Sequence, residues 1–151
     1  MASIEDIKKI RELTGAGVTD VKEALDTAGG DTKKALKILK ERGVDIAAKK
    51  AQRATSQGLV ETYTHLGKVG AMVEVNCETD FVARNPEFKD FVHDIALQVA
   101  SLDSEKIEDL LKMELIKEPG KTVQELITEK IARLGENIKI KRFQRFVLGE
   151  W

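Results

Sequence analysis

The spacing of apolar residues changes from helical to alternating at Gly58, and that change constrains the fold more than any other feature. Before Gly58, apolar residues recur every three or four positions, whereas residues 59–66 and 69–77 alternate and are rich in β-favouring side chains. The first spacing is that of an amphipathic helix, and the second is that of a strand. We therefore predict an α+β protein in which a helical module precedes a core that contains a sheet.

The amino-terminal module is predicted to span residues 1–43 and to be a bundle of three short helices separated by glycines. Ser3 is suited to cap the first helix, and the run Gly15-Ala16-Gly17 ends it. A second helix stops at Gly29-Gly30, and a third runs up to Gly43. The expected buried face consists of Ile4, Ile7, Ile10, Leu13, Val18, Val21, Ala24, Leu25, Ala28, Ala35, Leu36, Ile38 and Leu39.

Residues 44–56 are predicted to form a basic, partly helical linker. They contain Lys49, Lys50 and Arg53 but lack the apolar stripe of a packed helix. A bundle as small as the preceding module is only marginally stable by itself. We therefore expect most of the hydrophobic core to lie beyond the linker.

Residues 57–151 are predicted to form an α+β core that also makes a dimer contact. Its first two strands, at 59–66 and 69–77, form an antiparallel hairpin, with Gly67 at the first central position of a type II′ turn. Residues 137–148 return to strand character, and the economical placement is antiparallel beside the hairpin. The core is thus expected to contain about three antiparallel strands.

Three helical stretches are predicted between the hairpin and the final strand. One follows Pro86, which suits the first position of a helix, and another runs from Ser104 to about Lys117. The third is opened by a capping box between Thr122 and Glu125. These helices are expected to pack on the sheet.

The final strand breaks its own alternation, because Ile138 and Ile140 share one face whereas Phe143 lies on the other. Phe146 and Leu148 change the phase again, so either a bulge intervenes or both faces of the sheet are covered. A second copy of the chain is a natural cover for the second face. We therefore predict a homodimer.

The composition excludes several classes of protein. Lys and Arg number 25 against 26 Asp and Glu, so the net charge of −1 provides no general attraction to nucleic acid or anionic lipid. Cys77 is the only cysteine, which excludes an internal disulfide and a thiolate metal cluster and suits a reducing compartment. No apolar run is long enough to span a membrane, and the acidic start resembles neither a signal nor a transit peptide. We predict a cytoplasmic protein, with a mature organellar chain as the alternative.

The residues typical of enzymes are absent or isolated. The chain lacks a phosphate-binding loop with its lysine, so no direct nucleotide binding is expected. His65 and His93 have no metal-ligand partner at useful spacing, and Cys77 follows an apolar strand, which favours an inert core thiol. We predict no catalytic residue, metal or cofactor.

The last strand carries Lys139, Lys141, Arg142 and Arg145 between phenylalanines, a pattern also found in RNA-binding sheets. Lysines on an edge strand more often guard against edge pairing, and the net charge is nearly neutral. Protection of the edge is therefore the favoured interpretation, and nucleic acid is not expected as a partner.

The turn after the second strand places an acid beside a large aromatic residue, Asp80 and Phe81. A ring held outside its own core is typically an anchor for a partner. For an arbitrary phenylalanine beside Val82, packing in its own core would be the favoured alternative.

Two segments closely resemble the signature stretches of the bacterial elongation factor Ts family. They are Arg11-Glu12-Leu13-Thr14-Gly15-Ala16-Gly17-Val18-Thr19-Asp20-Val21-Lys22-Glu23-Ala24-Leu25 and Glu74-Val75-Asn76-Cys77-Glu78-Thr79-Asp80-Phe81-Val82-Ala83-Arg84. The resemblance extends through residues 47–51 and 134–138. Longer members carry a second core half and a further helical appendage, whereas this chain ends at Trp151 and resembles the short forms. A second copy of the chain is expected to stand in for the second half.

The resemblance implies a guanine nucleotide exchange factor for elongation factor Tu, the GTPase that delivers aminoacyl-tRNA to the ribosome. In this family the Asp-Phe pair reaches the nucleotide domain of the partner near its magnesium site, and these roles fall on Asp80 and Phe81. The adjacent Thr79 and Val82 are counted with them as partner-binding residues. Asp80 either caps the short helix that presents the ring or contacts the partner directly.

The amino-terminal module resembles ubiquitin-associated domains, and in this family it grips a helix of the partner. The resemblance implies that Arg11, Gly15 and Val18 contact the partner, although the helical phase of Val18 also fits the module's own core. The alternative function is that of a non-enzymatic adaptor, whose bundle binds peptides or helices and whose core only dimerises.

Overall fold

The computed structural model describes residues 2–103 and 105–150, and Ser104, the predicted start of a helix, lies outside the described residues. The amino-terminal module contains α1 (Ile4–Thr14), α2 (Val18–Thr27) and α3 (Thr32–Lys50). Ser3 caps α1 by accepting a hydrogen bond from the amide of Asp6. The module's core consists of Ile7, Ile10, Val21, Ala24, Leu25, Ala35 and Leu39.

Three residues assigned to the buried face of the module are in fact exposed. Ile4 and Leu13 lie at the two ends of α1 and are 78% and 56% exposed, and Val18 is 42% exposed. Ile7 and Ile10 alone bring α1 onto its neighbours. All three residues stand at or near helix ends, where a short bundle leaves part of the apolar period exposed.

The prediction that the third helix ends at Gly43 is wrong, because α3 continues to Lys50 through most of the predicted linker. Gly43 is buried, and a side chain at its position would lie 3.5 Å from the Cβ atom of Ala132. Ala132 belongs to α7 (Val123–Leu134), which packs directly on α3. Gly43 therefore lies in the contact between the two helices, and this packing of α3 on α7 outweighs the poor intrinsic helix propensity of glycine.

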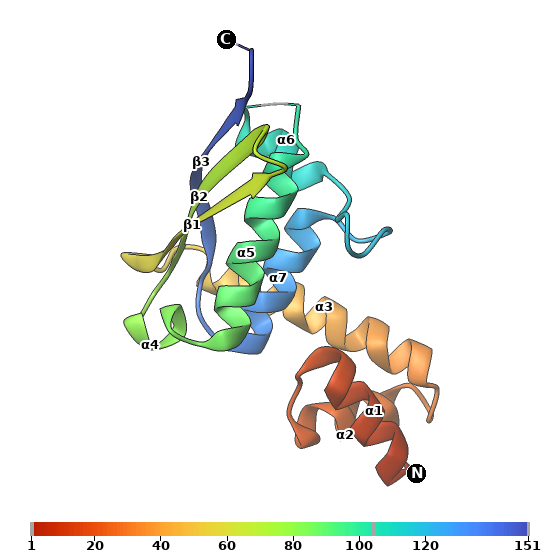
Figure 1. Cartoon of the computed structure of the whole chain (residues 1–151). Helices are drawn as coiled ribbons and strands as arrows, with labels where there is room; N and C mark the ends of the chain where they lie inside the picture. Colours follow the sequence, from red (N-terminus) through yellow and green to blue (C-terminus); the bar gives the residue numbers. More distant parts are fainter. Residues whose placement is uncertain (1, 104, 151) are drawn as a thin grey trace.

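In the described part of the chain, β1 (Gln57–His65), β2 (Val69–Cys77) and β3 (Lys139–Val147) form one antiparallel sheet in that order. Figure 1 shows α5 (Pro86–Ala100) and α7 covering one face of this sheet, with α6 (Ile107–Lys112) at its upper end. Phe88, Phe91, Val92, Ile95 and Val99 of α5 are almost fully buried against the sheet. The predicted α+β class and the antiparallel third strand are confirmed.

The hairpin turn differs from the predicted type II′. The amide of Lys68 donates to the carbonyl of His65 at 3.0 Å, which makes Leu66 and Gly67 the central residues. Their φ angles are 53° and 68°, and positive φ at both positions is the pattern of a type I′ turn. Gly67 is therefore the second central residue, and Leu66 adopts a conformation that is unusual for its type.

The irregular alternation of the last strand is caused by a bulge, one of the two predicted explanations. Glu74 pairs with Arg142, but the next residue, Val75, pairs with Ile140, so Lys141 is an extra residue. The bulge returns Phe143 to the face that bears Ile140, where it packs against the core. The other face carries exposed Val60, Met72 and Phe146 on its three strands.

The helix predicted from Ser104 to about Lys117 is much shorter, since α6 covers only Ile107–Lys112. The buried amide of Gln98 on α5 explains the difference. It donates to the carbonyl of Glu114 at 2.9 Å and accepts from the amide of Ile116 at 3.1 Å. These backbone groups are thereby taken out of a helix and held extended.

The last helix begins as predicted, because Thr122 and Glu125 form a complete capping box at the start of α7. Its end, Gly135, has the left-handed φ of 78° that glycine favours. Among the described residues, none of the helices has the length and apolar character needed to cross a membrane.

Candidate functional site

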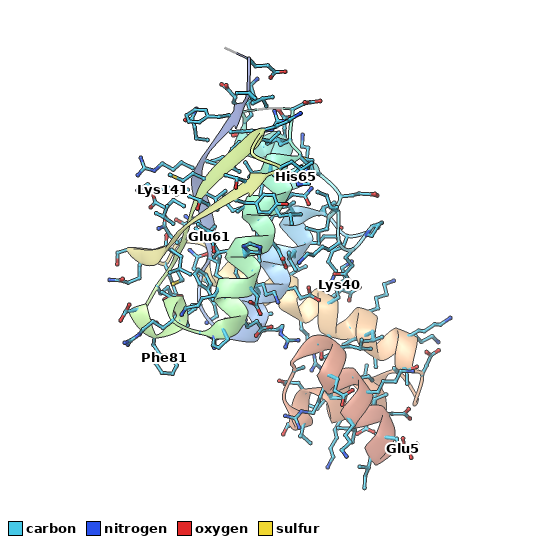
Figure 2. All side chains as sticks on the ribbon, in the orientation of Figure 1. Glu5, Lys40, Glu61, His65, Phe81 and Lys141 are labelled. Carbon is cyan, nitrogen blue, oxygen red and sulfur yellow. The ribbon has the colours of Figure 1, made fainter. Side chains whose placement is uncertain are left out.

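Phe81 lies on α4 (Asp80–Ala83), a single helical turn at the end of β2, and its side chain is 78% exposed. Figure 2 shows the ring pointing away from the ribbon. Its neighbours Val82 and Ala83 are 6% and 3% exposed and belong to the main hydrophobic core. The predicted outward orientation of the ring is confirmed. The turn that carries the ring is anchored in the core by Val82 and Ala83.

Thr79, rather than Asp80, caps this turn. The amide of Val82 donates to the Thr79 hydroxyl oxygen at 3.3 Å. Asp80 instead forms an exposed ion pair with Arg84, with 3.1 Å between Asp80 Oδ2 and Arg84 Nη2. Of the two roles considered for Asp80, the helix cap is therefore excluded, and its carboxylate lies at the surface beside Phe81.

Glu136 binds the two residues that precede α4, and it was not among the predicted site residues. Its Oε1 accepts the backbone amides of Glu78 and Thr79 at 3.1 and 3.0 Å, and its Oε2 accepts the Thr79 hydroxyl at 2.6 Å. Gly135 precedes it in a left-handed conformation, which turns the chain back towards β2. The sequence signal was the position of Glu136 in the matched segment 134–138, which carries no distance information.

Glu78 and Asn137 complete a reciprocal contact between the same two segments. The Asn137 amide donates to Glu78 Oε2 at 2.6 Å, so each segment offers a carboxylate to the backbone of the other. The buried Asn137 side chain also donates to the carbonyl of Arg53 at 2.9 Å and to that of Ala51 at 3.4 Å. We call Glu78, Thr79, Glu136 and Asn137 the α4 brace.

Cys77 lies at the base of this brace, where it is fully buried. Burial, followed by the nearby Glu136 carboxylate, raises the pKa of its thiol to about 11. The thiol donates to the carbonyl of Thr79 at 3.2 Å. A neutral, enclosed thiol is a poor nucleophile, which agrees with the predicted inert role.

The second predicted surface surrounds the turn between α1 and α2. Arg11 is exposed and donates through Nε to the carbonyl of Ala16 at 3.3 Å, and Val18 begins α2 at the surface. Gly15 has a left-handed φ of 69°, and a Cβ atom there would lie 2.8 Å from Cζ of Arg133. The left-handed φ therefore favours glycine at this position, and a side chain there would also displace the end of the Arg133 side chain, whatever the role of the turn towards a partner.

A chain of ionic contacts connects this turn to the region of α4. Arg133 Nε lies 2.6 Å from Glu87 Oε1, and Lys130 lies 3.2 Å from the same atom. Glu87 is in the first turn of α5, which begins directly after α4 and the cap residue Asn85. The turn at Gly15 thus lies beside α7, whereas α4 packs on α5, and both surfaces lie in the lower half of the molecule in Figure 1.

The two histidines lie together on β1 and α5 rather than in a metal site. His93 Nδ1 is 3.9 Å from Glu61 Oε2, and Tyr63 contacts the rings of both histidines. The hydroxyl of Tyr63 lies 3.0 Å from His65 Nδ1. Within residues 2–103 and 105–150, no cluster of metal-binding side chains is present.

Comparison with known proteins identifies relatives across the whole chain. A family model described as elongation factor TS matches residues 78–150, which include α4 and the entire brace. An elongation factor Ts of Clostridium kluyveri is 46% identical over 99% of this chain, which spans 49% of that protein. Those of Carboxydothermus hydrogenoformans and Rubrobacter xylanophilus are 41% and 42% identical, and the alignments span 90% and 98% of their lengths.

The chain therefore spans about half the length of one relative and most of the length of others. The segments that match contain both the exposed ring of Phe81 and the turn at Gly15. With more than 40% identity to relatives that it covers almost completely, this chain belongs to the elongation factor Ts family.

Proposed function

We propose that this protein promotes the release of GDP from elongation factor Tu and so allows GTP to rebind. Membership of the elongation factor Ts family supports this proposal, and the observation that carries it is the exposed ring of Phe81 on an anchored helical turn. A large apolar side chain that is 78% exposed on a rigid support is suited to enter a pocket in another protein. No covalent chemistry by this chain is needed.

The proposed mechanism is negative coupling between two ligands of the GTPase. Phe81 enters an apolar pocket near the magnesium and nucleotide site, and burying a phenyl ring contributes about 1.5–3 kcal/mol. This free energy holds the partner in a conformation that binds GDP and magnesium weakly. By linkage, nucleotide must weaken the binding of the exchange factor to the same degree, so fresh nucleotide displaces it.

The turn at Arg11, Gly15 and Val18 is proposed as the second contact with the partner. The exposure of Arg11 and Val18 supports this role. The contact of Gly15 with Arg133 makes Gly15 a support of the turn, in addition to any contact with the partner. Two separated contacts increase affinity because the second forms within an existing complex.

The proposal is tested by loading elongation factor Tu with a fluorescent GDP and following release in excess unlabelled nucleotide. Substoichiometric amounts of the protein should accelerate release, because each molecule is displaced and acts again. The matched control is Leu66→Ala, which removes an apolar side chain that is 82% exposed on the hairpin turn, at the far end of β2 from Phe81. Binding without acceleration would contradict exchange and favour the adaptor function.

We further propose that the chain forms a homodimer through the open face of the sheet. Val60, Met72 and Phe146 are 62%, 51% and 71% exposed on that face. Met72 pairs with the uncharged Thr62 and Gln144, and Phe146 pairs with Gly70. Val60 pairs with Glu74, whose carboxylate forms an ion pair with Arg142 at 2.8 Å. A sheet face that exposes large apolar side chains on all three strands is suited to bind its own copy about a twofold axis.

A further inference from the structure

Two segments that matched the family without a known role meet in the structure. Residues 47–51 form the end of α3 and its cap, and residues 134–138 connect α7 to β3. Asn137 binds the carbonyls of Ala51 and Arg53, while Glu136 binds the turn before α4. The connection between α7 and β3 thus holds the linker on one side and the support of Phe81 on the other.

Both carboxylate oxygens of Glu136 accept hydrogen bonds from the turn before α4. Among the described residues, its donors are the amides of Glu78 and Thr79 and the hydroxyl of Thr79, at 2.6–3.1 Å. Hydrogen bonds to a charged acceptor are stronger than those between neutral groups. One side chain therefore holds residues 78–79 through two backbone amides and one hydroxyl group.

The Thr79 hydroxyl transmits this restraint to α4. Its hydrogen is directed to Glu136 Oε2, so its oxygen is free to accept the amide of Val82 at 3.3 Å. Without the carboxylate, the hydroxyl hydrogen has no fixed direction, and the cap of α4 loses its orientation. A single helical turn has little stability of its own, so the cap and the anchoring residues must hold it.

The direction of the Phe81 ring depends on this restraint, because a ring that is 78% exposed is little restrained by packing in its own chain. Its position is set by the backbone of α4. If α4 frays, only a fraction of molecules present the ring in the direction that binding requires, and the apparent affinity falls by that fraction. A pre-formed turn avoids this loss.

We propose that Glu136 is the positioning residue for Phe81: through its three hydrogen bonds to residues 78–79, its carboxylate holds α4 and the ring ready to bind before any partner arrives. This inference rests on the proposed exchange function. It goes beyond that function by assigning the control of the ring to a residue that need not touch the partner. It also predicts that the effect of Glu136 on exchange depends on Phe81.

The first test compares Glu136→Gln with Glu129→Gln in the fluorescent GDP release assay. Glutamine at 136 keeps the size but turns an NH2 group towards donors, so we expect the concentration for half-maximal acceleration to rise about tenfold. Glu129 is a matched control, because it lies on α7 and both of its carboxylate oxygens accept hydrogen bonds from Lys121, not from the turn before α4. An unchanged Glu136→Gln curve would overturn the inference, whereas inactive wild-type protein would overturn the exchange function itself.

The second test combines Glu136→Gln with Phe81→Ala. If Glu136 acts through the ring, the double variant should be no slower than Phe81→Ala alone, because the ring that Glu136 positions is already gone. Full additivity of the two effects would show that Glu136 acts elsewhere and would contradict the inference.

A third measurement needs no partner and separates positioning from general loss of structure. Amide hydrogen exchange of Val82 should become at least about tenfold faster in Glu136→Gln, while amides in α5 stay protected. Equal loss of protection in α5 or unchanged protection of Val82 would contradict the local role. If Glu136→Gln does not fold, Glu136→Asp replaces it, because the shorter side chain keeps the charge but moves the carboxylate away from its three donors. Faster exchange at Val82 with protected amides in α5 is again the expected result.

Discussion

Phe81 and Phe146 are both exposed rings, 78% and 71%, but their surroundings differ. Phe81 projects from a single helical turn, which the hydrogen bonds of the four residues of the α4 brace hold in place. Phe146 lies on an open sheet face opposite Gly70, with exposed Met72 on the same face. A projecting ring on a rigid support is suited to enter a pocket, whereas a ring in a flat apolar area is suited to be covered. Exposure alone does not distinguish these roles; the support does.

The largest expected effect concerns Phe88, which is fully buried beneath the sheet and provides the contrast to both exposed rings. Phe88→Ala should destabilise the fold by about 3–5 kcal/mol, because it leaves a cavity in the core. Phe81→Ala and Phe146→Ala should each change stability by less than about 0.5 kcal/mol. Urea unfolding followed by circular dichroism measures all three, and a large loss for Phe81→Ala would show that its ring packs in its own core.

Phe81→Ala should lower the acceleration of GDP release by about 10- to 100-fold, since the burial of a phenyl ring contributes about 1.5–3 kcal/mol. Phe146→Ala should leave this rate within about twofold at protein concentrations where the assembly state is unchanged. The release assay with labelled GDP measures both variants. Equal losses of acceleration in Phe81→Ala and Phe146→Ala would contradict the distinction between a ring that enters the partner and a ring that a second copy covers.

Phe146→Asp should weaken the proposed dimer by at least about tenfold, because the interface would bury an unpaired carboxylate twice, once in each copy. Sedimentation velocity across a range of concentrations measures the change. Leu66→Asp is the control, because it places the same charge at the hairpin turn, where aspartate tolerates positive φ. A wild-type protein whose sedimentation stays that of a monomer at all concentrations would contradict the dimer.

The smallest expected effect concerns the ion pair between Lys40 on α3 and Glu125 on α7, whose atoms lie 2.9 Å apart. The hydrogen bond from Lys40, followed by that with the Thr122 backbone, lowers the pKa of Glu125 below 4.5. Its contribution is therefore present above pH about 4.5 and is lost as the pH falls through the lower folded pKa. Both side chains are substantially exposed, which limits the effect to about 0.2–1 kcal/mol.

Lys40→Ala should abolish this part of the pH dependence, which urea unfolding at pH 7 and at pH 3 measures. The variant should bring the two stabilities closer together by the stated amount. It should also leave sedimentation unchanged, because the pair lies away from the open sheet face. A difference between the two pH values equal to that of the wild type would show that this pair does not contribute.

Much of the local structure could be predicted from residue type and spacing. The change of period at Gly58, the capping box at Thr122 and the proline at the start of α5 are local signals, and each was confirmed. The end of α3 was predicted wrongly because Gly43 has poor helix propensity by itself. Its burial against Ala132 is a contact across 89 positions of sequence (132 minus 43), which no local pattern contains.

The candidate site divides in the same way. The pair Asp80 and Phe81 was found from its place after an apolar strand and from resemblance, and the outward ring is confirmed. Thr79 as the cap and Glu136 as its acceptor were missed, because Glu136 is 57 positions away in sequence. In the sequence, a glutamate after a glycine at a helix end cannot be told from an ordinary solvated residue. Only the fold brings Glu136 into contact with the residues before α4.

The sequence by itself determined the α+β class, the position of the hairpin and the resemblance to the elongation factor Ts family, because periodicity and short motifs are local properties of the chain. Only the tertiary structure decided which glycines end a helix and which lie inside one, and which carboxylate holds the turn that carries Phe81. These depend on contacts between distant segments. Burial changes the balance between a residue's intrinsic preference and the hydrogen bonds and packing available to it.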